Sequence, residues 1–429
     1  MKSTNEVALR KYWRLSFGLV TLVLLCLGTA VAQPKYKVTD LGTLGGNNSI
    51  PSRINGRGQV VGLAETSQPD PNSPGSLVFH AFLWEEGMMH DLGTLAADST
   101  VWNSQAFDVN NHGDVVGWSN TGALASGSPE FRGFVWRDGA MTGLGTLGGN
   151  NSQANAINDA RQVAGTAEIA TVDPSFAPSL SFHGFILHNG TMKDLGTLAS
   201  GPDSFVNAIN ERGEIVGGSQ VNTVVNPLLG FPPFYGFLWK NGVMINLTPN
   251  VGSNPFDINK RAQVVGRLVA DENGVPISHA FVWERGMRHD LGTLPGLPNS
   301  EAQSINDKGQ IVGDSGTGTI ESFNSVAAWH TEDSVMTDLN KLIPADSAFH
   351  LIVAYDINAH GQIVASGVET KTGNVHAILL NPRDENNESL VEADAARRQY
   401  VVLSESARKV LARGKSGLGK SKAGMSTPR

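Results

Sequence analysis

INGRGQVVG, at residues 54–62, is the stretch that decides the fold, because close copies of it recur through the 429-residue chain. In each copy an Asn is followed by two variable residues, usually a Gly, and a Val-rich run, which suits a tight turn whose last residue has positive φ. Arg161 and Ala262 stand where the Gly is expected, so we expect those two turns to be distorted or built differently. The other copies are VNNHGDVVG (109–117), INDARQVAG (157–165), INERGEIVG (209–217), INKRAQVVG (258–266), INDKGQIVG (305–313) and INAHGQIVA (357–365).

Two further landmarks recur in register with the first. One is the apolar run HAFLW (80–84), and the other is the triplet DLG that begins at Asp40. The apolar run returns as RGFVW (132–136), HGFIL (183–187), YGFLW (235–239), HAFVW (279–283), SVAAW (325–329) and HAILL (376–380). The triplet returns at 91, 143 (GLG), 194, 246 (NLT), 290 and 338 (DLN), in steps of 51, 52, 51, 52, 44 and 48 residues.

A period near 50 residues with four short β-rich runs in each unit is typical of propeller blades rather than helical solenoids. Asp138-Gly139, Asn189-Gly190 and Asn241-Gly242 are strong hairpin signals between the third and fourth runs. YKVTDL (36–41) is a fourth strand without a blade, and HAILL is a third strand without a fourth. We therefore predict an all-β, seven-bladed propeller of four-stranded blades, closed by pairing these two strands. An open or differently closed β-repeat array is the alternative.

The His-Ala-Phe core at 80–82 and 279–281, flanked by Ile-Asn-x-x-Gly and Asp-Leu-Gly-Thr-Leu, resembles the bacterial HAF-type "probable extracellular repeat" family. The resemblance covers roughly residues 36 to 382, with seven units in register. It implies an exported β-repeat protein and brings no reaction that can be transferred residue by residue. The sixth unit departs most, with Ser325-Val326-Ala327 in place of His-Ala-Phe.

Residues 1–32 are predicted to be a secretory signal peptide. A basic start precedes an apolar run from Leu15 to Leu27, and Ala30-Val31-Ala32 forms a small-x-small cleavage site. The apolar run is short for a membrane helix. We expect a secreted, periplasmic or cell-surface protein after cleavage near Ala32. The single Cys, Cys26, lies inside this segment, so neither disulfides nor thiolate metal sites are expected in the exported part.

Charge separates the predicted domains. Residues 33–382, the predicted propeller, hold 18 basic and 33 acidic residues, a formal charge of −15, which opposes binding to nucleic acid. The tail, 383–429, holds 10 basic and 6 acidic residues and is basic beyond Glu405. Its residues 388–412 fit an amphipathic helix, although disorder is favoured, and the tail is the one part expected to reach anionic lipid or envelope polymers.

Several stretches imitate catalytic or phosphate-binding motifs. GTLGGNNS, at 42–49 and 145–152, looks like a phosphate loop, but it lies between a fourth and a first strand with no helix after it, so a blade-to-blade crossover is preferred. GKSGLGKS (414–421) matches the P-loop spacing inside a polar tail without the required strand and helix. GDSGTG (313–318) resembles a protease serine motif but continues a Val-Val-Gly run.

His and Asp residues that recur at equivalent positions of the repeats are the candidate metal ligands. His80, His183, His279 and His376 occupy equivalent places around the ring and cannot converge on one ion, so each is expected to hydrogen-bond a loop. Asp108, Asp257 and Asp356 lie on first strands near the channel without a calcium-loop pattern, and packing is the simpler role. We predict no catalytic, metal-binding or cofactor-binding residue and no cofactor.

The loops after the second and fourth strands share one face of a propeller, and variable loops on a rigid scaffold are where recognition usually resides. The candidate binding residues on this face are Asn47, Asn48, Trp102, Asn103, Asn150, Asn151, Phe231, Phe234 and Tyr235. The sequence favours a non-enzymatic exported protein that recognises a polysaccharide or an envelope protein. A polymer-acting hydrolase or lyase is the first alternative, favoured by a carboxylate pair or His site near the axis. A purely structural repeat protein is the second.

Overall fold

The structure, a computed structural model, divides into Met1–Ala32 and Gln33–Arg429. It describes residues 35–125, 127–174, 179–199, 201–226, 232–249, 251–272, 275–317, 325–330, 335–383 and 401–414. The predicted signal peptide and the P-loop-like stretch beyond Gly414 lie outside the described residues. No helix among the described residues is long and apolar enough to cross a membrane.

The described strands form seven four-stranded antiparallel sheets, each in a simple up-and-down order. Three sheets are β2–β5 (Gly45–Ile54, Val60–Pro69, Leu77–Glu85, Met88–Asp91), β6–β9 (Ser104–Val109, Val115–Ala125, Ser128–Arg137, Ala140–Gly143) and β10–β13 (Gly148–Ile157, Val163–Val172, Leu180–His188, Thr191–Gly196). Three more are β14–β17 (Ser204–Ile209, Ile215–Gln220, Phe234–Lys240, Val243–Asn246), β18–β21 (Ser253–Ile258, Val264–Glu272, Val275–Glu284, Met287–Gly292) and β22–β25 (Asn299–Ile305, Ile311–Gly316, Ser325–His330, Val335–Asp338).

The remaining sheet joins the two ends of the repeat region. Its order is β1 (Tyr36–Asp40), β28 (Val375–Pro382), β27 (Ile363–Glu369) and β26 (Phe349–Ile357). β1 pairs antiparallel with β28, with Val38 opposite Leu380. The pairing continues beyond β1, where the Leu41 amide donates to the Ala377 carbonyl at 2.9 Å.

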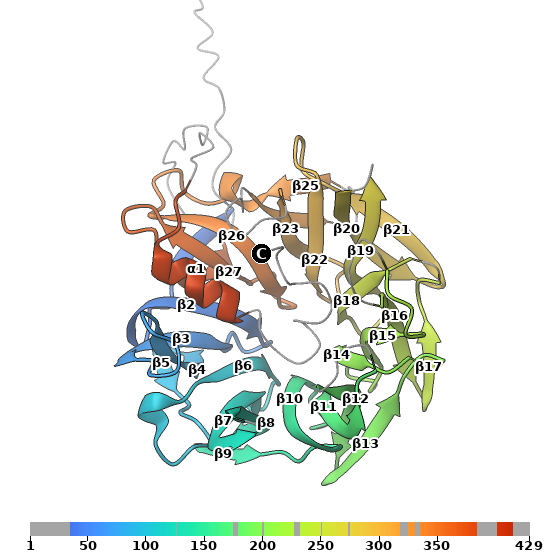
Figure 1. Cartoon of the computed structure of the whole chain (residues 1–429). Helices are drawn as coiled ribbons and strands as arrows, with labels where there is room; N and C mark the ends of the chain where they lie inside the picture. Colours follow the sequence, from blue (N-terminus) through green and yellow to red (C-terminus); the bar gives the residue numbers. More distant parts are fainter. Residues whose placement is uncertain are drawn as a thin grey trace, which may run out of the picture. The chain divides into compact units, whose positions relative to one another are not determined.

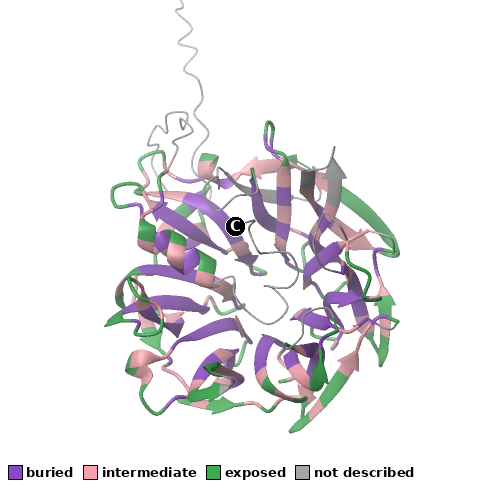
Figure 2. Cartoon of the chain, viewed as in Figure 1, coloured by how far each residue is buried: buried purple, intermediate pink, exposed green. Residues whose placement is uncertain are grey.

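The sheets are arranged around a common centre (Figure 1). The innermost strand of each sheet is the one that precedes the Asn turn: β2, β6, β10, β14, β18, β22 and β26. The fourth strands lie outermost and are mostly exposed, whereas the inner strands are buried (Figure 2). The predicted all-β propeller with four-stranded blades is confirmed.

Packing inside each blade explains two of the recurring letters. The Phe of the HAF run is fully buried at Phe82, Phe134, Phe185, Phe237 and Phe281. In the six blades whose Val-Val-Gly run ends in Gly, a bulge in the first strand brings a carbonyl close to that Gly, whereas the seventh copy ends in Ala365. A Cβ on Gly117 would lie 1.9 Å from the Gln105 carbonyl oxygen, which no side chain can tolerate. The Val-Val-Gly run therefore carries Gly because the bulged strand occupies the space of a Cβ.

The Asn of each Ile-Asn pair holds its own turn and the neighbouring blade. In Asn55, Oδ1 accepts from the amides of Arg57 and Gln59, and Nδ2 donates to the Asn110 carbonyl at 2.9 Å. Asn358 Nδ2 donates back to the Asn55 carbonyl at 3.0 Å. The intervening links run from Asn110 to Asn158, Asn210, Asn259, Asn306 and Asn358. A closed chain of these bonds therefore runs around the face that carries the tight turns, the turn face.

The expectation of distorted turns at Arg161 and Ala262 was wrong. These residues take φ of 59° and 58°, in the same left-handed region as Gly58 at 81°. The Arg161 and Ala262 amides donate to Asn158 and Asn259 carbonyls at 2.9 and 3.0 Å, as in the glycine turns. The Asn side chain bonds the turn in the same way, so the surrounding hydrogen bonds hold a strained residue in place.

Residues 401–414 are ordered and contain helix α1 (Glu405–Gly414). Within the stretch predicted as an amphipathic helix, 388–412, the apolar residues Leu403, Val410 and Leu411 are buried. They pack with Ala407 against apolar side chains from the first sheet and from the β26–β28 sheet. The platform consists of Ile50, Leu63, Phe79, Ile352, Val368 and Val375. Helix α1 therefore spans the junction where the two ends of the repeat region meet (Figure 1).

Candidate functional site

The His of the HAF run bonds the Asp of the DLG triplet in the same blade. His80 Nδ1 lies 2.9 Å from Asp91, and His376 Nδ1 lies 3.0 Å from Asp40 across the β1–β28 pairing. His183 with Asp194 and His279 with Asp290 repeat the contact at 2.8 and 2.9 Å. Each pair lies in a different blade, so the four histidines hold four separate strand ends. The sequence analysis predicted that each His forms a hydrogen bond with a loop. The structure shows a hydrogen bond for each His, but the partner is the Asp of the DLG triplet, which was not predicted.

Two of these pairs, His80 with Asp91 and His376 with Asp40, have shifted pKa values on both partners. Burial alone would lower the pKa of His80, but its hydrogen bonds and the charge of Asp91 raise that pKa above the ordinary value. The hydrogen bond to Asp40 raises the pKa of His376 despite partial burial. Burial opposes the change, but the His bonds lower the pKa of Asp91 and of Asp40.

The two GTLGGNNS loops bind a carboxylate from their own chain. The Asn47 amide and Asn48 Nδ2 donate to Glu65 Oε2 at 3.3 and 2.8 Å. In the second copy, the amides of Asn150 and Asn151 donate to Oε2 of Glu168, both at 3.0 Å. The phosphate-like loop is therefore an anion-binding turn whose anion is internal to the blade.

Only the two blades that carry GTLGGNNS have Glu at this place on the second strand. Alternate blades instead have Ser one residue earlier on that strand, where the GTLGGNNS blades have Ala. The hydroxyls of Ser119, Ser219 and Ser315 accept from the amides of Leu95, Leu198 and Leu294. The diverged crossovers GTLAADST, GTLASGPDS and GTLPGLPNS belong to this second kind. The loop sequence and the partner residue change together from blade to blade.

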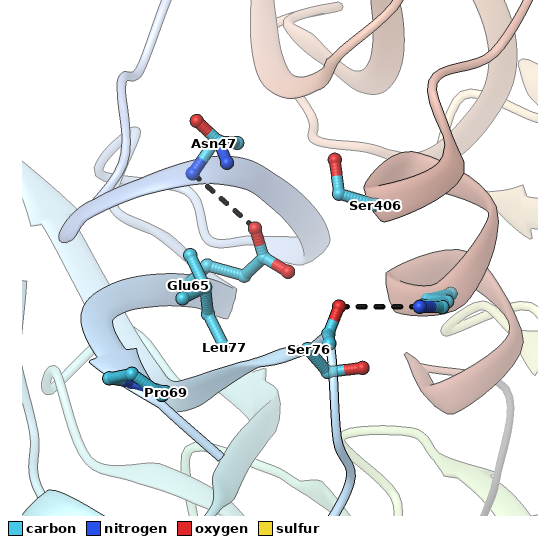
Figure 3. Close-up of a pocket in the computed structure, with 8 residues that line it drawn as sticks. Asn47, Glu65, Pro69, Ser76, Leu77 and Ser406 are labelled. Atoms are coloured by element: carbon cyan, nitrogen blue, oxygen red, sulfur yellow. Dashed lines mark hydrogen bonds between the residues drawn. The ribbon is translucent and has the colours of Figure 1, made fainter.

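One pocket lies beside the first GTLGGNNS loop on the loop face, the face that carries the crossovers and the loops between second and third strands. Its volume is about 330 Å³, and α1 forms one wall. Asn47 and Glu65 face Ser406 of α1 across the opening, with Pro69 and Leu77 on the strand side (Figure 3). The lining residues are Asn47, Glu65, Pro69, Gly75, Ser76, Leu77, Ser406 and Lys409.

Ionic contacts hold α1 against the pocket. Arg413 pairs with Asp70, which is only 3% exposed, and its guanidinium lies 4.7 Å from the centre of the Phe79 ring. Lys409 Nζ donates to the Gly75 carbonyl at 3.3 Å and pairs with Glu405 at 2.9 Å. The helix therefore contributes two basic groups beside the pocket, both already paired with acids.

The two carboxylate oxygens of Glu65, in the pocket, differ in their hydrogen bonds. The hydrogen bonds from the Asn47 amide and from Asn48 Nδ2 both end on Oε2 of Glu65, a residue that is only 2% exposed. In the other copy, Glu168 accepts on both oxygens, since Asn151 Nδ2 donates to Oε1 at 3.1 Å. Burial raises the pKa of Glu65, and the bonds from Asn48 and Asn47 only partly offset this effect.

Charged groups also gather near the axis on the first strands. Arg53 lies 3.3 Å from Asp257 and 3.2 Å from Asp356, and Ser304 Oγ contacts both carboxylates. Burial raises the pKa of Asp108 to about 6, against the charge of Arg53. Burial also raises the pKa of Asp356 despite the same Arg. These carboxylates accept blade-to-blade bonds from the amides of Ile54, Ile157 and Ile305, so the packing role expected for the three Asp residues fits.

A second carboxylate pair lies on the sixth sheet. Glu301 and Asp314 are directly opposite each other on β22 and β23. Gln303 Nε2 lies 3.1 Å from Glu301 Oε2 and 3.2 Å from Asp314 Oδ1, and Arg267 pairs with Glu301 at 2.5 Å. Asp314 belongs to the protease-like GDSGTG stretch, but Ser315 in that stretch bonds the Leu294 amide and the Asn299 carbonyl. The serine is thus used in the blade crossover.

The predicted binding residues divide between surface and interior. Asn47 and Asn150 are exposed, and Trp102, Asn151 and Tyr235 are partly exposed. Phe231 lies outside the described residues. The other three belong to the interior and are not available as surface contacts: Asn48, Asn103 and Phe234.

The buried asparagines were misplaced because they connect blades. Asn48 Oδ1 accepts from the Val375 amide and Asn103 Oδ1 from the Phe79 amide, at 3.0 and 2.9 Å. Phe234 packs on Phe205, with ring centres 5.1 Å apart. Sequence reasoning missed Glu65, Ser406 and Lys409; the restriction of Glu to the two GTLGGNNS blades was the available signal for Glu65.

No protein-family model matches the chain, and no curated protein matches it. Similar solved structures include the β-propeller domain of the Trilobed protease from Pyrococcus furiosus, at 10% identity and a TM-score of 0.48, covering 80% of this chain and 100% of that one. Uncomplexed Pyrococcus horikoshii acylaminoacyl peptidase matches at 11% identity and 0.45, covering 80% of this chain and 52% of the other. YCF48 bound to D1 peptide matches at 9% and 0.44, covering 83% and 99%.

The likeness is at the level of the fold. The chain spans about half the length of the acylaminoacyl peptidases it matches. At these identities and scores the matches show no activity, since one fold hosts many functions.

Proposed function

We propose that the protein is an exported, non-enzymatic propeller that uses its loop face to recognise a polysaccharide or a cell-envelope partner. The observation that carries the proposal is the asymmetry of the two faces. On the turn face, the Asn side chains are used in the blade-to-blade bonds. The loop face holds exposed Asn47 and Asn150, partly exposed Trp102 and the pocket beside α1. Concave sites with a few polar groups are where small ligands usually bind.

A glycan array probed with the exported chain, residues 33–429, tests this proposal. Saturable binding is expected, and Trp102→Ala should weaken it at least tenfold, since an aromatic ring supplies much of a binding surface. Arg285→Ala is the matched control, because Arg285 is 86% exposed in a tight turn on the other face. Binding to no glycan and to no envelope fraction would overturn the proposal, and so would equal loss in both variants.

We also propose that the chain is an HAF-type extracellular repeat protein and that residues 1–32 direct its export. The family proposal is supported by the pairing of the HAF histidine with the DLG aspartate in four blades. Units two and four lack both partners, with Arg132 and Gly143 in one and Tyr235 and Asn246 in the other. Fractionation of expressing cells, with N-terminal sequencing of the exported chain, tests export and expects Gln33 as the first residue.

The proposed architecture is a ring of seven blades closed by β1. The β1–β28 pairing and the return of the Asn bonds from Asn358 to Asn55 support it. Removing residues 33–41 deletes the closing strand and leaves β28 as an open edge. The shortened chain should unfold at a lower temperature and aggregate, whereas an unchanged melting curve would contradict closure.

A second candidate function is hydrolysis of a polysaccharide at Glu301 and Asp314. One amide nitrogen bonds both carboxylates, so they lie close enough to act on one bond. In such a reaction one carboxyl group protonates the leaving oxygen, and the other acts on the sugar as nucleophile or through water. Reducing sugar released from a polysaccharide panel, and lost in both Glu301→Gln and Asp314→Asn, would support this function. No release from any substrate would exclude it for that panel.

A further inference from the structure

We propose that the pocket between the first blade and α1 binds a single hydroxyl-rich unit, such as one sugar residue of a polysaccharide, with Glu65 as its central acceptor. The inference rests on the proposed recognition function and assigns it a site. The pocket of about 330 Å³ is at the small end of ligand sites, which suits one such unit rather than a longer chain.

Oxygen Oε1 of Glu65 is the first support. Glu65 is almost fully buried, and the hydrogen bonds from the Asn47 amide and Asn48 Nδ2 both end on Oε2. Glu65 Oε1 is not one of the described buried atoms that lack a partner, so it is open to the pocket, and a ligand hydroxyl can donate to it. The second GTLGGNNS loop shows the alternative, because Asn151 Nδ2 reaches Oε1 of Glu168 and completes that carboxylate from within. In the first loop, Asn48 is the residue equivalent to Asn151, and its Nδ2 donates to Oε2 of Glu65 instead.

The other lining groups fix the ligand class. Asn47 is exposed at the rim and offers an amide, and Ser406 offers a hydroxyl from the opposite wall (Figure 3). Lys409 adds a donor, while Pro69 and Leu77 give an apolar surface for ring carbons. Neighbouring hydroxyls both donate and accept, so they can satisfy Glu65 and the opposite donors together.

The charges around the pocket disfavour the two charged alternatives. An anion would meet the Glu65 carboxylate inside a small cavity. A cation would be repelled by Lys409 and Arg413, and this repulsion is reduced because Glu405 and Asp70 pair with them. An uncharged, hydroxyl-bearing ligand avoids both repulsions.

The site also needs α1. Ser406 and Lys409 are lining residues supplied by the helix, so the pocket exists only while residues 401–414 are docked. The ligand would therefore contact two parts of the chain that are far apart in sequence, and its binding should strengthen the hold of α1 on the first blade.

Methyl glycosides of glucose, galactose, mannose and N-acetylglucosamine, titrated into residues 33–429 by NMR, test the inference. At least one should bind saturably. Glu65→Gln and Lys409→Ala should each weaken that binding at least tenfold. Glu168→Gln is the matched control, because it changes the equivalent residue of the third blade, and it should alter affinity less than twofold. Melting curves establish that each variant is folded, and Lys409→Ala lies on the helix surface, so the test does not depend on Glu65→Gln alone.

The outcomes separate this inference from the proposed function. Binding that persists unchanged in Glu65→Gln and Lys409→Ala would overturn the site assignment and leave loop-face recognition intact. Array binding by the whole chain without binding of any methyl glycoside would overturn the single-unit site. Failure to bind any glycan or envelope partner would overturn the proposed function, and this inference with it. Binding of lysine methyl ester in place of the glycosides would show that the ligand is a cation.

Discussion

His80 and Asp91 belong to two different sequence landmarks, and their contact explains both at the scale of single residues. Asp91 also accepts from the Gly93 amide at 2.8 Å, and His80 Nε2 lies 2.8 Å from the Ser99 carbonyl. The pair therefore fastens the start of the third strand to the end of the fourth and to the following crossover. In three other blades the His–Asp contact recurs, and the Asp again accepts from the Gly amide two residues on.

Ionisation of the pair predicts how stability depends on pH. The pKa of His80 is raised on folding, so its contribution is full below about pH 6.5 and is lost as pH rises through the folded value. The pKa of Asp91 is lowered on folding, so its contribution is present above about pH 4 and is lost as pH falls through the folded value. We expect the pair to contribute most between these limits.

Urea denaturation from pH 3 to 9 checks this prediction. His80→Gln should lower the free energy of unfolding by about 1–3 kcal/mol near pH 5.5, because it removes the hydrogen bond between buried His80 and the charged Asp91. The loss should shrink as pH rises above 7. His90→Gln, at an exposed position in the same blade, is the control. A His80→Gln curve parallel to that of the native chain at all pH values would contradict the assignment.

At the scale of elements, the crossovers show why glycines of one motif have different roles. A Cβ on Gly149 would lie 2.4 Å from Glu168 Cβ, so this Gly lets the loop close on its carboxylate. A Cβ on Gly145, in the same GTLGGNNS copy, would meet nothing within 4 Å. The first and fifth residues of the motif are both Gly, but only the fifth lies too close to its neighbour to accept a Cβ.

Alanine substitutions separate the two glycines. Gly149→Ala should destabilise the chain by about 1–3 kcal/mol, as expected for overpacking, and Gly145→Ala by no more than about 0.5 kcal/mol. Thermal denaturation by circular dichroism measures both. Equal effects would mean that the loop does not close on Glu168 as described.

The elements could be predicted from sequence because their signals are local. Hairpin turns, Val-rich strands and the 50-residue period are each readable within one repeat. The partners of the crossovers were not readable, since Glu168 lies on the next strand and only the comparison of all blades shows that it accompanies the GTLGGNNS loop. Asn48 and Asn103 were placed on the surface because polar loop residues usually are exposed, whereas here they bond the neighbouring blade.

At the scale of the whole molecule, the Asn bonds connect every blade to the next. Asn259 illustrates the connection: Nδ2 donates to the Asn306 carbonyl at 3.1 Å, and Oδ1 accepts from the Arg261 and Gln263 amides. Asn259→Ala should lower the free energy of unfolding by about 2–4 kcal/mol, because it leaves buried groups unsatisfied. Asn222→Ala, at an exposed loop position, should cost about 0.5 kcal/mol or less. Similar midpoints for both variants in urea would contradict the connecting role.

Helix α1 follows the repeat region in the sequence and packs against both the first sheet and the β26–β28 sheet. Its position was not predictable from sequence, because the platform under it combines side chains from the first sheet with others from the β26–β28 sheet. The amphipathic pattern of the tail shows an apolar face without showing what covers it. The structure supplies that partner, together with the buried Asp70 that receives Arg413.

Removing α1 should therefore leave both an exposed apolar platform and an unpaired buried carboxylate. A chain ending at residue 400 should lose about 3–5 kcal/mol of stability, the range for breaking a buried ion pair from one side. Asp70→Asn should destabilise the intact chain but recover part of the loss in the shortened one, since Asn can still bond the Asn72 amide that Asp70 binds at 2.8 Å. Thermal denaturation of the four chains forms a double-mutant cycle. Additive effects would mean that Arg413 and Asp70 do not interact, and that α1 contributes only through its apolar residues.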